Sequence, residues 1–447
     1  MSIVRIGAGA GFQGDRIDPA VDLARRGELD FLVFECLAER TIALAQLAKL
    51  KNPILGFDPL LERRMRAVLP HCARSGTRIV TNMGAANPRA AAERTSAIAL
   101  ELGLRDLKVA AVLGDDVLDR VGPLILDETG QRADALGDRL VSANAYIGVA
   151  SIVEALDHGA DVVICGRASD PALFLAPLIH SFGWAPDDWT RLGRGTLVGH
   201  LLECAAQVTG GYFADPGVKD VPGLANLGFP IAEVSADGNA VITKLAGTGG
   251  LVTRATCAEQ MLYEIHDPAR YYQPDVIADF SMVTLEEIAR DRVAVHGADG
   301  HAATGKFKVS VGYRDGWLGE GQISYGGSNC VGRGELAGAV LRERLADVRD
   351  SIFEDRVDLI GWNSISPGRA RGDAPAEVRL RYAARCSDRD SALRIGEEVE
   401  GLYLNGPAGG GGVFGSVREI IGIASTFIDA ADVTPSIAFM EIPHEIT

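Results

Sequence analysis

Residues 3–40 read IVRIGAGAGFQGDRIDPAVDLARRGELDFLVFECLAER, and the order of residues in this stretch indicates the fold class. It holds a short apolar run, a glycine-rich loop, an amphipathic segment and a second apolar run that ends in polar residues. The same order recurs through the first half of the chain. Apolar runs without alternation are typical of parallel strands that are covered on both faces. The pattern therefore predicts an α/β fold with a mostly parallel, doubly wound sheet and right-handed crossovers.

The repeated pattern also places the elements and a domain boundary. Strands are expected at residues 3–6, 31–35, 54–57, 78–82, 107–113 and 161–165, and helices at 19–26, 40–50, 60–75, 88–102 and 152–158. Periodicity is lost over 210–228, where glycine and proline are frequent, so we place a boundary near residue 225. Residues 1–225 then form the parallel domain. Residues 226–447 form an α+β domain that completes the site and is expected to hold a helix at 415–421.

The composition excludes several classes of protein. A formal net charge of −16 argues against nucleic acid, because phosphate binding needs a basic surface. The basic stretch Arg63-Arg64-Met65-Arg66 lies in an expected helix, and we interpret it as a solvated face. The seven cysteines are scattered and never in C-x-x-C spacing, which favours reduced thiols in a cytoplasmic protein. Neither a signal peptide nor a membrane span is predicted.

Polar residues that follow four of the predicted strands indicate a ligand site. Ligands of such sheets bind outside the carboxyl ends of the strands. These residues are Glu35 and Cys36, then Asn82 and Gly84, then Asp115 and Asp116, then Arg167, Ser169 and Asp170. Arg167 and the N–H groups of the helix that follows it can together hold an anion. The alternative is that the aspartates only cap helices.

The N-terminal glycine loop allows three interpretations. Gly9, Gly11 and Gly14 fit the spacing G-x-G-x-x-G and follow a strand, as in a dinucleotide-binding loop. The next helix begins late, however, whereas that fingerprint opens directly into a helix. The loop can instead be a tight turn that exposes Asp15 and Arg16 to a pocket. In the third interpretation the glycines are purely structural.

Three side-chain groups are candidates for chemistry of a different kind. Cys36 is a candidate nucleophile, with a small core residue as the alternative. His266 lies in a predicted loop and is an acid/base candidate, with a capped helix end as the alternative. His200 and Glu203 share one helix face, and we expect a surface or core pair there rather than a metal site.

Two glycine-rich loops in the second half are suited to binding anions. Lys244 precedes Gly247-Thr248-Gly249-Gly250, which brings a cation, a hydroxyl group and flexible backbone together. Residues 406–412, with Gly409 and Gly410 at their centre, precede the helix expected at 415–421. Such a loop can direct several N–H groups at a phosphate, carboxylate or thioester oxygen. A flexible linker is the alternative for this second loop.

Four stretches of the chain resemble one known family. They read GAGFQGDRIDPA at 9–20, DFLVFECLAERT at 30–41, CGRASD at 165–170 and GPAGGG at 406–411. In these stretches the chain resembles the acyclic terpene utilisation family, the AtuA-like proteins, and the likeness runs to about residue 440. The resemblance implies a role in the catabolism of branched acids and terpenoids as coenzyme A thioesters. It also implies a lyase or hydratase step on a hydroxyacyl-CoA.

The resemblance further implies a partner protein. In that family the long domain is fused to, or encoded beside, a small domain called ferredoxin-like for its fold. The chain ends soon after residue 441, which leaves no room for a fused domain. A separate small ferredoxin-fold protein is therefore an expected partner, and a homo-oligomer is also expected.

The first functional hypothesis is a lyase that acts on an acyl-CoA or a related carboxylate. A base would remove a proton next to a carbonyl, with Glu35, Asp115 and His266 as candidates. N–H groups of the loops at 9–14 or 406–412 would stabilise the oxyanion. No redox cofactor is required; carboxylates such as Asp115 and Asp116 would suit Mg²⁺, but nothing in their spacing requires it. The alternatives are a nucleotide-dependent oxidoreductase and a non-catalytic subunit that scaffolds the small partner.

Overall fold

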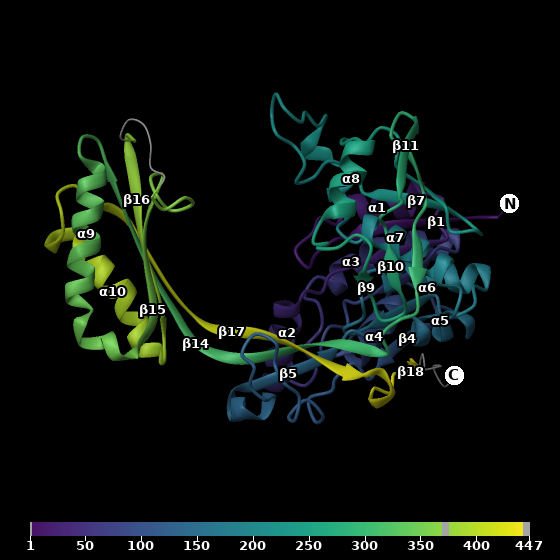
Figure 1. Cartoon of the computed structure of the whole chain (residues 1–447), viewed down its shortest axis with the longest axis horizontal. Coiled ribbons are helices and arrows are strands. Elements are labelled where there is room, and N and C mark those ends of the chain that lie inside the picture. Colours follow the sequence, from purple (N-terminus) through teal and green to yellow (C-terminus); the bar gives the residue numbers. More distant parts are fainter. Residues whose placement is uncertain (1, 369–374, 441–447) are drawn as a thin grey trace. The chain divides into compact units, whose positions relative to one another are not determined.

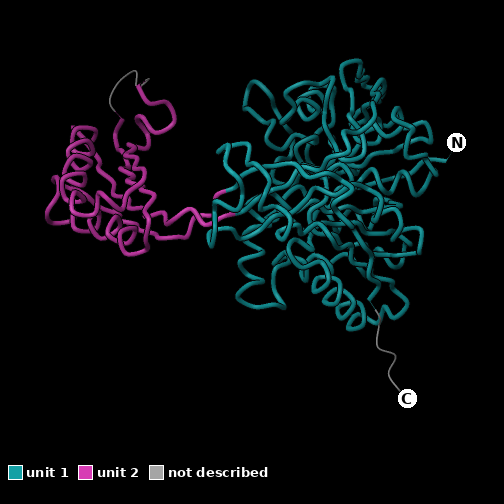
Figure 2. Tube along the Cα trace, turned by 60° about the horizontal axis from the view of Figure 1, so that its bottom comes forward, with its two compact units in different colours: residues 1–312, 423–447 teal, residues 313–422 magenta. Residues whose placement is uncertain are grey.

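The computed structural model describes residues 2–368 and 375–440. The chain divides into two compact units, which Figure 2 shows in different colours. Unit 1 comprises residues 1–312 together with 423–447, and unit 2 comprises residues 313–422. The fold as a whole is mixed α/β.

A ten-stranded mixed sheet forms the centre of unit 1 (Figure 1). Its middle is five adjacent parallel strands, as the apolar runs predicted. In spatial order they are β1 (Ile3–Ala10), β2 (Phe31–Phe34), β3 (Arg78–Thr81), β6 (Val162–Cys165) and β4 (Val109–Leu113). Every residue of β2 and β6 is buried, which explains why these strands are apolar without alternation.

Antiparallel strands extend the sheet on both sides of this parallel centre. Beyond β1 lie β7 (Pro230–Ser235), β8 (Ala240–Lys244), β12 (Arg292–His296) and β11 (Thr284–Ala289), and beyond β4 lies β18 (Ser436–Phe439). The boundary that we placed near residue 225 does not coincide with the observed division. Because β7 pairs directly with β1, the chain after residue 225 continues the same sheet.

Eight helices of unit 1 surround this sheet in the part of the chain that the structure describes. They are α1 (Asp18–Arg26), α2 (Glu39–Lys51), α3 (Leu61–Ser75), α4 (Pro88–Glu101), α5 (Ala150–Asp157), α6 (Ala172–Phe182), α7 (Trp189–Leu202) and α8 (Arg254–Leu262). Helix α4 packs on β4, α1 packs on β1, and α6 contacts β1, β2 and β3. The strand expected at residues 54–57 is instead a turn between α2 and α3. Ile54 and Leu55 are exposed there, so this apolar run joins no core.

Smaller strands complete unit 1. The strands β13 (Asp299–His301), β10 (Ile277–Asp279) and β9 (Tyr271–Tyr272) form a three-stranded antiparallel sheet that packs against α7. The strand β5 (Leu140–Ala145) pairs with the long strand β14 (Lys306–Gly326). These strands supply several walls of the cavity described below.

Unit 2 has the element order of a ferredoxin-like, split βαβ fold. After β14 come α9 (Cys330–Arg344), β15 (Ile352–Ile360), β16 (Glu377–Cys386), α10 (Arg389–Asn405) and β17 (Gly411–Asp429). The strands lie in the order β15-β16-β14-β17. Buried side chains of both helices and of the sheet share one core, including Leu341, Leu380 and Ile395. The prediction of a helix at 415–421 is wrong, because these residues lie in β17. The β-branched side chains of β17 suit a strand.

The end of β1 generates a prediction about packing. A β-carbon at Gly11 would lie 2.5 Å from the carbonyl carbon of Cys204, which follows α7. We expect Gly11→Ala to lower the free energy of unfolding by about 1–3 kcal/mol, since backbone atoms cannot move aside cheaply. Gly122→Ala is the matched control, because its β-carbon would meet only Asp134 Cβ at 3.6 Å. Chemical denaturation measures both, and equal stability of the two variants would contradict this packing.

Candidate active site

Glu35 and Asn82 brace the carboxyl ends of β2 and β3. The side-chain amide of Asn82 donates to Glu35 Oε1 at 2.9 Å, and its Oδ1 accepts the Cys36 N–H at 2.7 Å. The Leu37 N–H donates to the same Glu35 oxygen at 2.8 Å. Burial raises the pKa of Glu35 well above its ordinary value. This carboxyl group, which we predicted as a base, is therefore held inside the protein by polar neighbours.

Asp115 likewise braces the carboxyl ends of β4 and β6. Its Oδ2 accepts the Arg167 N–H and the Asn144 side-chain amide, both at 2.9 Å. Burial raises the pKa of Asp115 to about 6 against these two hydrogen bonds. Asp116 instead accepts the Leu118 N–H at 3.1 Å in a local turn. The two adjacent carboxylates thus have separate structural partners.

The Arg167 side chain is buried and fully engaged by protein groups. Its guanidinium donates to the carbonyl oxygens of Leu37 and Ala168 and to the carboxylate of Asp170. The same group lies 4.4 Å from the centre of the Tyr146 ring, within the range of a cation–π interaction. We predicted that Arg167 would hold a ligand anion. The anion that it contacts is Asp170.

A cavity of about 580 Å³ opens beside Asp170, entirely within unit 1. Aromatic rings supply much of its wall. Carboxyl groups, two ammonium groups and the hydroxyl groups of Ser169 and Thr304 supply the polar part. The lining residues are Glu39, Tyr146, Ser169, Asp170, Pro171, Glu264, Tyr271, Tyr272, Gln273, Pro274, Thr304, Lys306, Lys308 and Phe427. A volume of this size and mixed lining suits a small organic ligand.

Glu39, Tyr146 and Lys308 form a polar triad on one wall of this cavity. The Tyr146 hydroxyl donates to Glu39 Oε1 at 2.6 Å, and Lys308 Nζ donates to the same oxygen at 3.2 Å. Burial opposes ionisation of Glu39, but the Tyr146 hydroxyl, a backbone N–H at Glu39 and Lys308 together outweigh it and lower its pKa to about 2. Lys308 Nζ also lies 5.0 Å from the centre of the Tyr146 ring. Glu39 is therefore a fixed negative charge rather than a base.

Asp170 is the strand-end carboxyl group that reaches the cavity. Its side chain is 35% exposed, and it pairs with the buried guanidinium of Arg167. Burial raises the pKa of Asp170 above its ordinary value, and Arg167 opposes that rise. The neighbouring Ser169 hydroxyl donates to the Gln273 side chain across the cavity wall. Ser169 and Asp170 were both predicted, whereas Gln273 was not.

The N-terminal glycine loop is a closed turn held by its own side chains. The Gly11 N–H donates to Asp15 Oδ2 at 2.9 Å, and Arg16 pairs with Asp18. A β-carbon at Gly9 would lie 2.6 Å from the Phe34 ring, so close packing requires glycine there. These contacts favour the structural interpretation of the loop. Gly14 and Gly84 also lie against neighbouring groups, namely the Phe12 ring and the Cys165 carbonyl oxygen.

Arg64 is buried against this loop and donates hydrogen bonds to its backbone. This corrects our interpretation of the basic stretch 63–66 as a solvated face. The Arg64 side chain is 0% exposed, and its Nη1 lies 3.1 Å from both Asp58 Oδ2 and Cys36 Sγ. Its Nη2 donates to the Gln13 carbonyl oxygen at 2.9 Å. Burial raises the pKa of the Cys36 thiol well above its usual value, which disfavours the nucleophilic thiolate.

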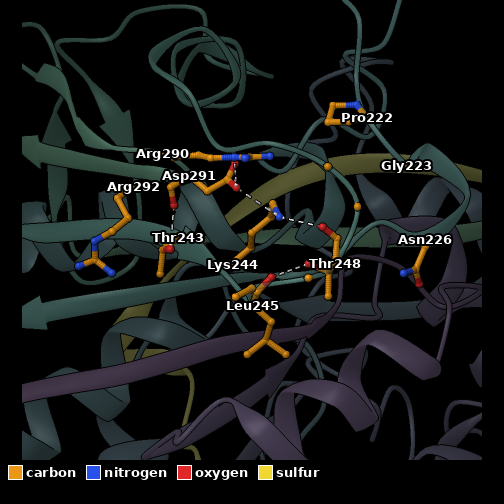
Figure 3. A pocket seen from close by; sticks show the side chains of 14 residues that line it. Pro222, Gly223, Asn226, Thr243, Lys244, Leu245, Thr248, Arg290, Asp291 and Arg292 are labelled. Carbon is orange, nitrogen blue, oxygen red and sulfur yellow. Dashed lines mark hydrogen bonds and ion pairs between the residues drawn. The ribbon is translucent and has the colours of Figure 1, made fainter.

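The Lys244 loop borders a second depression, of about 800 Å³ (Figure 3). Lys244 Nζ donates to the Thr248 carbonyl oxygen at 3.0 Å and lies 3.5 Å from the Asp291 carboxylate (Figure 3). The N–H groups of Gly249 and Gly250 donate to the carbonyl oxygens of Asn226 and Pro222. The groups that we predicted to hold an anion thus already have partners within the protein, and we assign the site to the cavity beside Asp170.

The remaining predicted residues lie elsewhere. His266 is exposed in a loop, while the same segment sends Glu264 and Tyr271 into the cavity wall. Gly409 and Gly410 belong to unit 2, where Arg333 donates to the Ala408 carbonyl oxygen at 2.7 Å. His200 and Glu203 form a buried pair, which is one of the two arrangements that we expected.

Sequence reasoning missed the polar triad of Glu39, Tyr146 and Lys308. Glu39 lies within the stretch 30–41 that carries the family resemblance, so a signal was present for it. Lys308 is 269 residues away from Glu39, and no local pattern joins them. Within residues 2–368 and 375–440, no three His, Cys, Asp or Glu side chains are grouped to hold a metal ion. The described helices also include none with the length and apolar content to span a membrane.

Comparison with known proteins places nearly the whole chain in one family. The family model described as "Acyclic terpene utilisation family protein AtuA" matches residues 4–439. A search of curated proteins gives no match to the chain.

The burial of Asp115 generates a prediction about pH. Its folded pKa of about 6 exceeds the ordinary 3.8, so between these pH values the unfolded state loses this proton more readily than the folded state does. Stability from this group is therefore highest below about pH 4 and is lost as the pH rises to 6. We expect Asp115→Asn to gain about 3 kcal/mol relative to wild type between pH 4 and pH 7. Denaturation at both pH values measures this, and a constant difference would contradict it. Asp138→Asn, at an exposed position, is the control.

Proposed function

This chain belongs to the acyclic terpene utilisation family, AtuA, and on that basis we propose that it is a lyase or hydratase. Membership supports a role in the utilisation of acyclic terpenes. The proposed substrate is a hydroxyacyl-CoA or a related branched carboxylate, and the proposed reaction adds or removes water. No redox cofactor is required for this chemistry.

The observation that carries the proposal is the position of Asp170. Its carboxyl group reaches a cavity whose wall includes Tyr146, Tyr271, Tyr272 and Phe427. Aromatic walls suit a branched hydrocarbon chain, while an adjacent carboxyl group with a raised pKa suits proton transfer. The ammonium groups of Lys306 and Lys308 line the same cavity and can stabilise negative charge on a carbonyl or carboxylate.

In the proposed dehydration one carboxyl group both removes the proton and returns it. The Asp170 carboxylate takes the proton from the carbon next to the carbonyl, and the electron pair of that C–H bond forms the double bond. The bond between the neighbouring carbon and its hydroxyl group then breaks. Asp170 returns the proton to the departing hydroxide, which leaves as water. Arg167 stabilises the ionised form of Asp170 in this sequence.

This proposal moves the acid/base role away from the residues first considered. Glu35 and Asp115 are buried and His266 is exposed, and none of the three is among the residues that line the cavity. Asp170, which we predicted as an anion-binding residue, takes that role. The nucleotide-dependent oxidoreductase loses its motivating feature, since Asp15 occupies the Gly11 N–H of the glycine loop.

The small ferredoxin-fold partner and a homo-oligomer remain part of the proposal. Chain length no longer supports a separate partner, because residues 313–422 already form a unit with ferredoxin-like element order. The partner therefore rests on the family resemblance. A non-catalytic scaffold is the alternative that the following experiment separates from an enzyme.

Asp170→Asn tests the proposal directly. The purified chain, with and without the small partner, is incubated with a panel of branched hydroxyacyl-CoA thioesters, and gain or loss of water is followed by mass spectrometry. We expect wild type to be active and Asp170→Asn to lose about 10²–10⁴-fold in kcat/KM. Asp187→Asn, at an exposed position before α7, is the matched control and should keep wild-type activity. Equal activity of both variants, or an inactive wild type, would contradict the proposal.

A further inference from the structure

A buried histidine–glutamate pair lies at the C-terminal end of α7, outside the lining of the cavity. His200 Nδ1 and Glu203 Oε1 are 2.8 Å apart, and their side chains are 1% and 12% exposed. The i, i+3 spacing places both residues on one helix face, which the sequence alone indicates. The proposed reaction gives this pair no role so far.

The pair lies directly behind two walls of the cavity. A β-carbon at Gly199 would lie 2.7 Å from Pro171 Cα, so this turn of α7 touches the residue that follows Asp170. On another side, the His200 ring centre lies 5.1 Å from that of Tyr271. Pro171 and Tyr271 both line the cavity. The pair and its turn of α7 thus contact two residues that line the proposed site.

The outer atoms of the pair have no hydrogen-bond partner among the residues that the structure describes. These atoms are His200 Nε2 and Glu203 Oε2, and the buried side-chain oxygens Gln260 Oε1 and Thr196 Oγ1 share this condition. An unpaired buried polar atom costs about 1–3 kcal/mol. Buried polar atoms without a partner are expected at a functional position, where a proton or an ordered water supplies the missing hydrogen bond.

We propose that the His200–Glu203 pair is a positioning pair that controls whether Asp170 carries a proton. A negative charge on the pair disfavours a second negative charge on Asp170, across the contact between Gly199 and Pro171. Protonation of the pair removes that charge and lets Asp170 ionise beside Arg167. This inference rests on the proposed role of Asp170 in proton transfer.

The surroundings of Glu203 support this coupling. Burial raises its pKa to about 7, His200 opposes the rise, and the charges of Asp170 and Glu264 add to it. Other titratable groups that face the pair are Cys204, which follows α7, and Tyr271 on β9. Asp170 itself is faced by the charges of Arg167, Glu39 and Lys308. Since two interacting acids titrate as a unit, removal of either should change the titration of the other.

The first test measures this coupling without any substrate. Protein labelled in its glutamate carboxyl carbons is titrated by NMR, with the Glu203 signal identified by its loss in Glu203→Gln. We expect the midpoint for Glu203 to fall by about half a pH unit or more in Asp170→Asn, because a negative neighbour is removed. Asp187→Asn is the control and should leave the midpoint unchanged. An unchanged midpoint in Asp170→Asn would overturn the inference.

The second test uses the pH profile of kcat/KM. We expect the limb that reports ionisation of Asp170 to move to lower pH by about half to one unit in Glu203→Gln. Glu259→Gln on the exposed face of α8 is the matched control, with the same change of charge. A profile that does not move overturns the inference. If wild type is inactive, the proposed function fails while the NMR test still decides the coupling. If Glu203→Gln does not fold, the Glu203 NMR signal is assigned from backbone correlations instead. Its midpoint in Asp170→Asn then still measures the coupling.

Discussion

The buried guanidinium of Arg167 is the interaction on which the site depends. It follows β6, contacts the backbone after β2 at Leu37, and pairs with Asp170 at the start of α6. A buried charge without partners costs several kcal/mol, so these contacts must form together with the fold. The Arg167 N–H also holds Asp115. One residue therefore joins three strand ends and sets the position of Asp170.

The acids of the site fall into two groups with different environments. Glu35 and Asp115 are enclosed by amide and N–H donors and brace the strand ends. Glu39 and Asp170 face the cavity, where Lys308 and Tyr146 lower the pKa of one and burial raises that of the other. Environments that separate the pKa values of neighbouring acids give those acids different roles in proton transfer. Glu39 supplies a fixed charge and Asp170 an exchangeable proton.

The parallel strands and most strand-end residues were predictable because their signals are local. An apolar run that ends in Glu35-Cys36 or in Cys165-Gly166-Arg167 marks a buried strand and its carboxyl end without knowledge of the rest. The burial of Arg64 was not predictable, since its partner Asp58 and the loop above it meet only in the folded chain. The pairing of β7 with β1 likewise joins segments more than 200 residues apart.

The residues of the cavity wall were also not predictable from local sequence. Tyr271 and Gln273 lie near His266 in sequence, and local reasoning chose the histidine because imidazole titrates near neutral pH. Only the three-stranded sheet that packs on α7 places Tyr271 in the wall and leaves His266 exposed. Side-chain chemistry alone could not decide between neighbours that face different ways.

Proton exchange at the carbon next to the carbonyl shows whether Asp170 removes a proton there. Wild type is incubated in deuterated water with a branched hydroxyacyl-CoA, and deuterium in the recovered thioester is measured by mass spectrometry. We expect incorporation at that carbon by wild type and its near loss in Asp170→Asn. Incorporation that persists in Asp170→Asn, or that wild type does not catalyse on any thioester that it converts, would contradict the assignment of Asp170.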